Sequence, residues 1–218
     1  MLLSVVRNIA VYSVRLTVSR LLYDFYGPIP IPTLEDLKNP LDEVIEPRAT
    51  QEEMTNFIET ELTESLKGLP TRTTQFGRFD KGLAYTILMK YYMHEKNWAK
   101  AEECGRELLK AEYGYGLMDR YADIFTLENE GNKEIIFACT EERGTNLQLW
   151  HDHALPGNYP TKNASIQKWD GYKVPWPFYR TFEEGDDRLS VLVGEYVGTD
   201  GVLFNEESDI AKHGNLYS

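Results

Sequence analysis

The segment from Gly77 to Glu112 constrains the fold most, because its sequence predicts two antiparallel helices joined by one tight turn. Asp80 and Asn97 stand where an N-cap residue would satisfy the first free N–H groups of each helix. After each cap, apolar residues recur at helical spacing and define one buried face. These residues are Leu83, Ala84, Ile87, Leu88, Tyr91 and Tyr92 in the first helix, and Trp98, Ala101, Cys104, Gly105, Leu108 and Leu109 in the second.

The same hairpin matches part of a tetratricopeptide repeat, which opens with the pattern W-x-x-L-G-x-x-Y. Tyr85, Leu88 and Tyr92 meet three of the four positions, and Met89 takes the glycine position. Ala101 is small where the second helix has to approach the first closely. The sequence therefore predicts a tetratricopeptide-like helical pair, in which Trp98 packs beside Ala101 against the first helix.

Composition bounds what this hairpin can belong to. A chain of 218 residues is long enough for one domain, or two small ones, with a core that needs no disulfides. The net charge of -12, from 23 basic and 35 acidic residues, argues against a nucleic acid as partner. Cys104 and Cys139 have no metal-binding or redox spacing, so we expect two buried thiols and neither a metal nor a cofactor.

Further elements flank the hairpin. Residues 1–26 carry apolar residues at helical spacing, including Leu21, Leu22 and Phe25, and predict one amphipathic helix. Thr50 and Glu53 form a capping box that begins a helix ending near residue 68. A short helical piece is expected around residues 121–125, and the apolar run 134–139 predicts a strand. From residue 140 onward the helical periodicity disappears, and aromatic residues alternate with Gly, Pro, Asn and Asp, which is typical of long functional loops.

Five segments in a fixed order carry a resemblance to a known family. They are YGPIPIP (26–32), RATQEEMTNFIETELTESLKGLP (48–70), GRFDKGLAYTILMKYYMHEKNWAKAEE (77–103), YADIF with NKEIIFA (121–125 and 132–138), and FEEGDDRL (182–189). In this order the chain resembles the SusD/RagB family. That resemblance implies a mainly α fold, in which tetratricopeptide-like helical pairs support a loop-rich, partly β ligand-binding portion.

The resemblance also implies a domain organisation. We expect a single SusD-like domain over residues 1–218 that is truncated at both ends, with a helical part over about 1–130 and a loop-rich part over about 131–218. Family members begin with a signal peptide and a lipid-bearing cysteine, and neither is present in this sequence. Pro28 also replaces the acidic residue that usually follows Tyr26-Gly27. The chain is therefore expected to be the central part of such a protein.

The function that the resemblance implies is nutrient uptake. SusD/RagB proteins are outer-membrane lipoproteins on the cell-surface side that bind glycans and work with a SusC-like TonB-dependent transporter in polysaccharide utilization. We accordingly expect a glycan ligand, no enzymatic activity and no cofactor, with membrane contact only through a lipid anchor. The alternative is a helical-repeat scaffold that binds protein partners and no sugar. A glycosidase is a third hypothesis.

Charged and imidazole groups offer some candidate chemistry. His151 and His153 could hold a metal if a third ligand arrived from elsewhere, but polar loop residues that hydrogen-bond a ligand or the backbone are the simpler explanation. Glycoside hydrolysis needs two carboxyl groups about 5 to 10 Å apart, which adjacent acids such as those of residues 183–187 rarely achieve. Asp187 and Arg188 are instead expected to form a structural ion pair.

Aromatic residues are the better candidates for a binding site, because the flat C–H faces of sugars stack on indole and phenol rings while their hydroxyl groups need polar partners. Trp150, Trp169 and Tyr172 lie close in sequence to amide, imidazole and carboxylate groups, including Gln167. The alternative is that these rings form the core of the loop-rich part. The candidate ligand-binding residues are Trp150, Trp169, Tyr172, Trp176, His151, Asn163 and Asp170.

Overall fold

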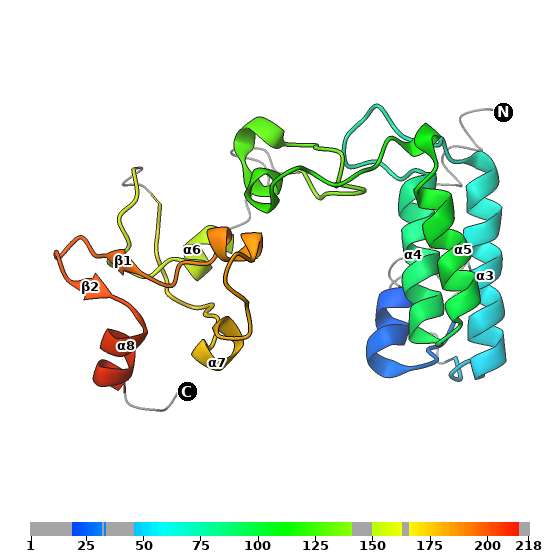
Figure 1. The fold of residues 1–218 in the computed structure, drawn as a ribbon. Coiled ribbons are helices and arrows are strands. Elements are labelled where there is room, and N and C mark those ends of the chain that lie inside the picture. The colour runs from blue at the N-terminus through cyan, green and yellow to red at the C-terminus, as the bar shows by residue number, and fades with distance from the viewer. Residues whose placement is uncertain (1–18, 32, 34–45, 141–149, 163–165, 214–218) are drawn as a thin grey trace. The chain divides into compact units, whose positions relative to one another are not determined.

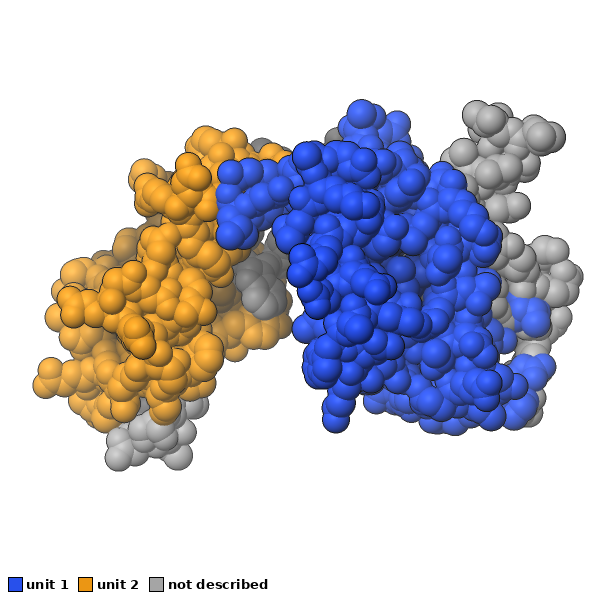
Figure 2. Space-filling model, turned by 45° about the vertical axis from the view of Figure 1, so that its right-hand side comes forward, with its two compact units in different colours: residues 1–117, 133–139 blue, residues 118–132, 140–218 orange. Residues whose placement is uncertain are grey.

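The computed structural model describes residues 19–31, 33, 46–140, 150–162 and 166–213 (Figure 1). The chain divides into two compact units, which Figure 2 shows in different colours. Unit 1 comprises residues 1–117 and 133–139, and unit 2 comprises residues 118–132 and 140–218. In the described part of the chain, every helix is too short or too polar to cross a membrane.

Three helices form the body of unit 1: α3 (Gln51–Gly68), α4 (Lys81–His94) and α5 (Trp98–Leu108). The predicted caps are confirmed, because Asp80 accepts from the N–H of Leu83 and Asn97 accepts from the N–H of Lys100. At the start of α3, the Thr50 side chain and Glu53 satisfy each other's backbone N–H groups in the expected capping box. Local sequence signals therefore fix where each helix begins.

The core of unit 1 lies where α4 packs against both α3 and α5 (Figure 1). Most of the apolar positions expected on α3 and α4 are buried there, and the partly buried Phe57, Leu66 and Leu83 pack against them. The buried set comprises Tyr23, Met54, Ile58, Leu62, Leu69, Ala84, Ile87, Leu88, Tyr91, Tyr92, Ala101 and Cys104. Met54 and Ile58 are fully excluded from solvent, so α3 contributes the most completely buried side chains.

The α4–α5 hairpin turns sharply through Lys96, whose φ of 57° lies in the left-handed region. The N–H of Asn97 donates to the carbonyl of Tyr92 at 2.8 Å and closes the turn. Close approach of the two helices is possible because Ala101 is small and buried. This arrangement confirms the predicted helical pair.

The predicted burial of Trp98 and Leu109 is wrong. Trp98 is 63% exposed and Leu109 is 80% exposed. Trp98 is the first residue of α5 and lies beside the turn, where α4 has already ended at His94 and the nearby Met93 is itself exposed. Leu109 follows the last residue of α5. Helical spacing places both residues on the buried stripe, but Trp98 lies beside the turn at the end of α4, and Leu109 lies at the C-cap of α5, where the preceding Leu108 takes the buried position.

The first described helix, residues 19–26, is anchored through Tyr23. The Tyr23 hydroxyl donates to Glu95 Oε1 at 2.5 Å and accepts from Gln51 Nε2 at 2.5 Å, which ties this helix to α3 and to the end of α4. The apolar face expected for this helix is wrong in its described part, because Leu21, Leu22 and Phe25 are exposed while Tyr23 is buried. The rest of the predicted helix lies outside the described residues.

Buried tyrosines make the stability of unit 1 sensitive to alkaline pH. Burial, helped by the hydrogen bond with Glu95, raises the pKa of Tyr23 to about 12, and burial also raises the pKa values of Tyr91 and Tyr92. The unfolded chain ionises its tyrosines near pH 10. The stabilisation is therefore complete below about pH 10 and is lost as the pH rises through 12.

We expect the helical circular dichroism signal to fall cooperatively across this alkaline range. Tyr23→Phe should retain more of its neutral-pH stability at the upper end of the range, since it removes one ionisable group. A helical signal that declines identically in the parent and in Tyr23→Phe would show that Tyr23 does not contribute.

Gly82 is required by the packing of Tyr115 onto α4. A Cβ at Gly82 would lie 2.0 Å from the Tyr115 hydroxyl, so the ring would have to move. Tyr115 is held from its other sides, because it stacks on Tyr113 and carries the Arg72 guanidinium over its ring at 4.9 Å. We expect Gly82→Ala to lower the free energy of unfolding by about 1–3 kcal/mol, although alanine favours helices. Tyr115→Ala in the Gly82→Ala background should recover part of the loss, and urea denaturation of the three variants tests this coupling.

The predicted strand over residues 134–139 is wrong. Among the described residues the segment pairs with no strand, and it contains a turn at residue 134 and a bend at residue 136. Just before this segment, the N–H of Gly116 donates to the carbonyl of Lys133. Phe137 instead packs its ring on Phe79 at 5.7 Å. Cys139 is exposed, so the expectation of two buried thiols holds only for Cys104.

Short elements make up the rest of the chain. The 3-10 helix η1 (Ala111–Tyr113) ends at Gly114 in the left-handed region, and η2 (Tyr121–Phe125) confirms the helical piece expected there. Unit 2 also contains η3 (Leu127–Asn129), α6 (Trp150–Ala154), α7 (Trp176–Tyr179), η4 (Asp187–Val191) and α8 (Glu206–His213). Strands β1 (Tyr196–Val197) and β2 (Leu203–Phe204) form an antiparallel hairpin that pairs Tyr196 with Phe204. A mainly α fold with a loop-rich, partly β portion is therefore confirmed.

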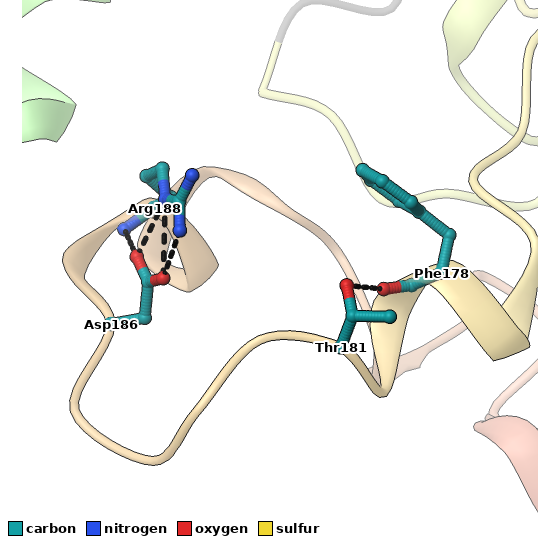
Figure 3. A network of polar contacts seen from close by, with 4 residues as sticks. All are labelled: Phe178, Thr181, Asp186 and Arg188. Carbon is teal, nitrogen blue, oxygen red and sulfur yellow. Dashed lines mark hydrogen bonds and ion pairs between the residues drawn. The ribbon is translucent and has the colours of Figure 1, made fainter.

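Asp186 and Arg188 form a bidentate ion pair at the start of η4 (Figure 3). Hydrogen bonds from Arg188 hold the pKa of Asp186 below its usual value. The expected pairing of Asp187 with Arg188 is wrong, because the Asp187 carboxylate accepts instead from the backbone N–H of Tyr121 at 2.6 Å. The acidic run around residue 187 thus joins η4 to η2, which is a structural role.

Candidate functional site

The candidate site lies in unit 2, where the chain after residue 168 returns to the end of α6. The backbone N–H of Trp169 donates to the carbonyl of Asp152 at 2.7 Å, and that of Asp170 donates to the carbonyl of Leu155 at 3.0 Å. The N–H groups of Gly171 and Tyr172 both donate to the carbonyl of His153. These bonds satisfy carbonyl groups that the end of a short helix leaves unpaired. They also fix the segment 169–172 against α6.

Three rings gather at this junction. The His153 imidazole lies 4.6 Å from the Trp169 ring in an edge-to-face arrangement, and 5.3 Å from the Tyr172 ring in a tilted one. Trp169 is 44% exposed and Tyr172 is 53% exposed, so both rings present apolar surface to solvent. We call His153, Trp169 and Tyr172 the aromatic platform.

Polar groups around the platform are already oriented. The indole N–H of Trp169 donates to Gln167 Oε1 at 3.0 Å, which leaves the ring face as the part of the indole that can meet a ligand. Asp170 adopts a left-handed φ of 54° and pairs with Lys173 at 3.1 Å. The platform therefore combines exposed ring faces with a carboxylate, an ammonium group and an amide that can exchange hydrogen bonds with hydroxyl groups.

Trp176, a fourth candidate, lies elsewhere in unit 2. It is 9% exposed, its indole N–H donates to Asp209 Oδ2 at 2.9 Å, and it packs against Tyr179 and Phe204. Tyr196 stacks on Phe204 at 5.0 Å, and burial raises the pKa of its hydroxyl. These rings form an aromatic core in unit 2, and Trp176 is a packing residue of that core. For Trp176 the geometry matches the core alternative.

Three further candidates lie at or beyond the edge of the described residues. Trp150 and His151 belong to α6 by their backbone, but their side chains lie outside the described part of the structure, as does Asn163. Among the described residues, the His, Cys, Asp and Glu side chains form no group of three or more that could hold a metal ion. Of the seven candidate residues, the structure thus brings together Trp169, Asp170 and Tyr172.

Sequence reasoning missed the role of His153. The sequence suggested for this residue either one half of a metal pair or a polar loop contact, whereas it is the ring that contacts both Trp169 and Tyr172. The contact depends on backbone hydrogen bonds between segments far apart in sequence, and no local pattern reports such bonds. The concentration of aromatic residues after Thr140 was the available signal, and it identified the region rather than the arrangement.

Comparison with known proteins places the fold. No family model and no curated protein matches the chain. A SusD superfamily protein from Bacteroides fragilis aligns over 90% of this chain with a TM-score of 0.66 and 18% identity. Surface glycan-binding protein A from Bacteroides thetaiotaomicron, solved in complex with laminarihexaose, aligns over 96% of this chain with a TM-score of 0.68 and 17% identity. The fold is SusD-like.

A further structure supports this assignment at higher identity. A SusD-like protein from Bacteroides fragilis shares 26% identity over 61% of this chain, with a TM-score of 0.52. The resemblance found in the ordered motifs is therefore confirmed by the three-dimensional arrangement. The chain spans 26% of the length of that protein and 46% and 45% of the other two SusD-like structures, so it corresponds to a part of each.

Proposed function

We propose that this chain is the binding portion of a non-enzymatic glycan-binding protein, and that Trp169 and Tyr172 of the aromatic platform contact the sugar. The observation that carries this proposal is the pair of half-exposed rings, Trp169 and Tyr172, which backbone hydrogen bonds hold against α6. Aromatic faces fixed in this way bury the apolar face of a sugar ring with little loss of side-chain freedom. Binding by stacking needs no proton transfer and no metal.

Similarity to a solved complex supports the ligand class. Surface glycan-binding protein A was crystallised with laminarihexaose, a neutral oligosaccharide, and its fold matches 96% of this chain. At 17% identity this likeness concerns the fold alone. The proposal that this chain binds a glycan therefore depends on the geometry of its own aromatic platform. The two observations together favour an oligosaccharide over a small polar metabolite.

Charge favours a neutral glycan over an acidic one. The chain carries a net charge of -12, which repels uronate or sulfate groups. The two lysines next to the platform in sequence are engaged, because Lys168 donates to the carbonyl of Tyr159 at 2.7 Å and Lys173 pairs with Asp170. Both ammonium groups are therefore already partly neutralised or hydrogen-bonded within the chain.

The biological setting is proposed from the SusD-like fold. We infer that the whole protein acts on the cell-surface side of an outer membrane and delivers glycan to a SusC-like TonB-dependent transporter. Its membrane attachment would then be a lipid anchor. Co-purification of the full-length protein with such a transporter from solubilised outer membranes tests this part separately from sugar binding.

One observation favours the alternative, a scaffold for protein partners. A groove of about 300 Å³ runs between α3 and α5 of unit 1, with Tyr85, Leu88 and Tyr92 of α4 among its lining residues. Lys100 of α5 reaches Glu59 of α3 at 2.9 Å beside it. A scaffold of this kind would bind partners through unit 1, and loss of the platform in unit 2 would leave that binding intact.

Isothermal titration calorimetry on the whole chain tests the proposed function. The panel comprises laminarihexaose, cellohexaose and maltohexaose as neutral ligands and a hexagalacturonate as the acidic one, each with and without a chelator. We expect at least one neutral hexasaccharide to bind, with an affinity that the chelator does not change. If only the galacturonate binds, the ligand is not a neutral glycan. If no member of the panel gives a binding heat, the result counts against glycan binding by this chain.

A further inference from the structure

His153 contributes to the aromatic platform through both its side chain and its backbone. Its imidazole meets the Trp169 ring edge-to-face at 4.6 Å and the Tyr172 ring at 5.3 Å. Its backbone carbonyl accepts from the N–H groups of Gly171, at 2.6 Å, and Tyr172, at 2.9 Å. The same residue therefore sets both the path of the returning chain and the orientation of two side chains on it.

The exposed rings need such a support. A half-exposed aromatic side chain is packed on only part of its surface, so its rotamer is weakly fixed unless a neighbouring group holds it. Edge-to-face contacts between aromatic rings add an orientation preference to ordinary apolar packing. His153 is itself only partly buried and offers such a contact to Trp169 and a tilted one to Tyr172. The two rings then share a support, and one cannot turn without losing contact with it.

We propose that His153 is a positioning residue that holds Trp169 and Tyr172 as one preorganised surface. This inference rests on the proposed glycan binding, which it deepens by assigning a role to a ring that does not itself need to touch the sugar. The role is distinct from metal binding, which would require the imidazole nitrogens and further ligands. It requires only a ring of suitable size at position 153.

Ring replacement tests this role through affinity. In His153→Ala the backbone hydrogen bonds and the helix-forming tendency of α6 are retained, but the shared support is lost. We expect its affinity for the best-bound neutral hexasaccharide of the panel to fall on the order of tenfold, as for a lost preorganising contact. His153→Phe restores a ring and should recover most of the affinity. If His153→Ala binds like the parent, or if His153→Phe binds no better than His153→Ala, the positioning role is overturned.

A second measurement does not depend on any sugar. Acrylamide quenching of tryptophan fluorescence reports the accessibility of Trp169 when the signal of a matched Trp169→Phe variant is subtracted. We expect acrylamide to quench this difference signal more strongly in His153→Ala than in the parent. In His153→Phe the quenching should return to the parent's level. Equal quenching in the parent and in His153→Ala would contradict the proposal even if glycans bind.

The two tests separate the possible failures. If the parent binds no sugar but quenching responds as expected, the proposed function fails and the positioning role of His153 stands. Circular dichroism establishes that each variant is folded. Should His153→Ala not fold, His153→Leu removes the ring while keeping apolar volume, and the same quenching and affinity outcomes apply to it.

Discussion

Tyr91→Ala will lower the free energy of unfolding by roughly 3–5 kcal/mol, because a large buried aromatic side chain leaves both a cavity and lost apolar burial behind. Tyr91 is 1% exposed in the last turn of α4, and its ring contacts Tyr23 and Tyr92. Its hydroxyl also donates to Thr55 Oγ1 at 3.0 Å, which links α4 to α3. A loss of this size removes much of the stability of an ordinary small domain.

Two matched variants separate the contribution of the hydrogen bond from that of ring burial. Tyr91→Phe removes only the hydrogen bond with Thr55 and should cost about 1 kcal/mol. Trp98→Ala removes a still larger ring, but one that is 63% exposed, and should change the free energy of unfolding by about 0.5 kcal/mol or less. Urea denaturation followed by circular dichroism measures all three. A Trp98→Ala variant that loses as much stability as Tyr91→Ala would show that the hairpin packs as the sequence predicted and not as the structure has it.

Local signals in the sequence predicted the helices of unit 1 well. Thr50, Asp80 and Asn97 cap the helices as expected, because a cap involves only residues three positions away. Helical spacing also predicted most of the core of α3 and α4. The same rule failed at Trp98, since spacing tells which face a residue lies on and not whether a neighbouring helix extends far enough to cover it.

Contacts between distant segments were harder to predict. The run over residues 134–139 has the composition of a strand, but a strand needs a partner strand to pair with. Its Phe137 side chain packs against Phe79 instead. Asp187 was expected to pair with its sequence neighbour and instead binds the backbone of Tyr121. In the site, Trp169 and Tyr172 were chosen by residue type, whereas their junction with His153 depends on how residues 169–172 return to α6.

Trp169→Ala should weaken glycan binding at least tenfold while leaving the fold intact. The ring is 44% exposed and its N–H is engaged by Gln167, so its exposed face is available for stacking. Central aromatic residues of a binding site commonly account for 2 kcal/mol or more of the binding free energy, or about thirtyfold in affinity. Since its side chain is partly outside the core, its removal should cost much less stability than that of a buried ring.

Tyr172→Ala should also weaken binding, and Trp176→Ala gives a contrasting case. Trp176 is buried and bonded to Asp209, so its removal should damage the fold of unit 2 together with any binding. This contrast distinguishes a ring that contacts the ligand from a ring that supports the unit. Thermal unfolding of each variant accompanies the binding measurement.

The most direct test is calorimetric titration of the parent, Trp169→Ala and Trp98→Ala with the hexasaccharide that the parent binds best. Trp98→Ala is the matched control, because it also removes a solvent-exposed indole but lies in unit 1. We predict that Trp98→Ala binds as the parent does and that Trp169→Ala, still folded by circular dichroism, loses at least tenfold in affinity. A folded Trp169→Ala variant with the parent's affinity would contradict the assignment of the aromatic platform as the glycan-binding surface.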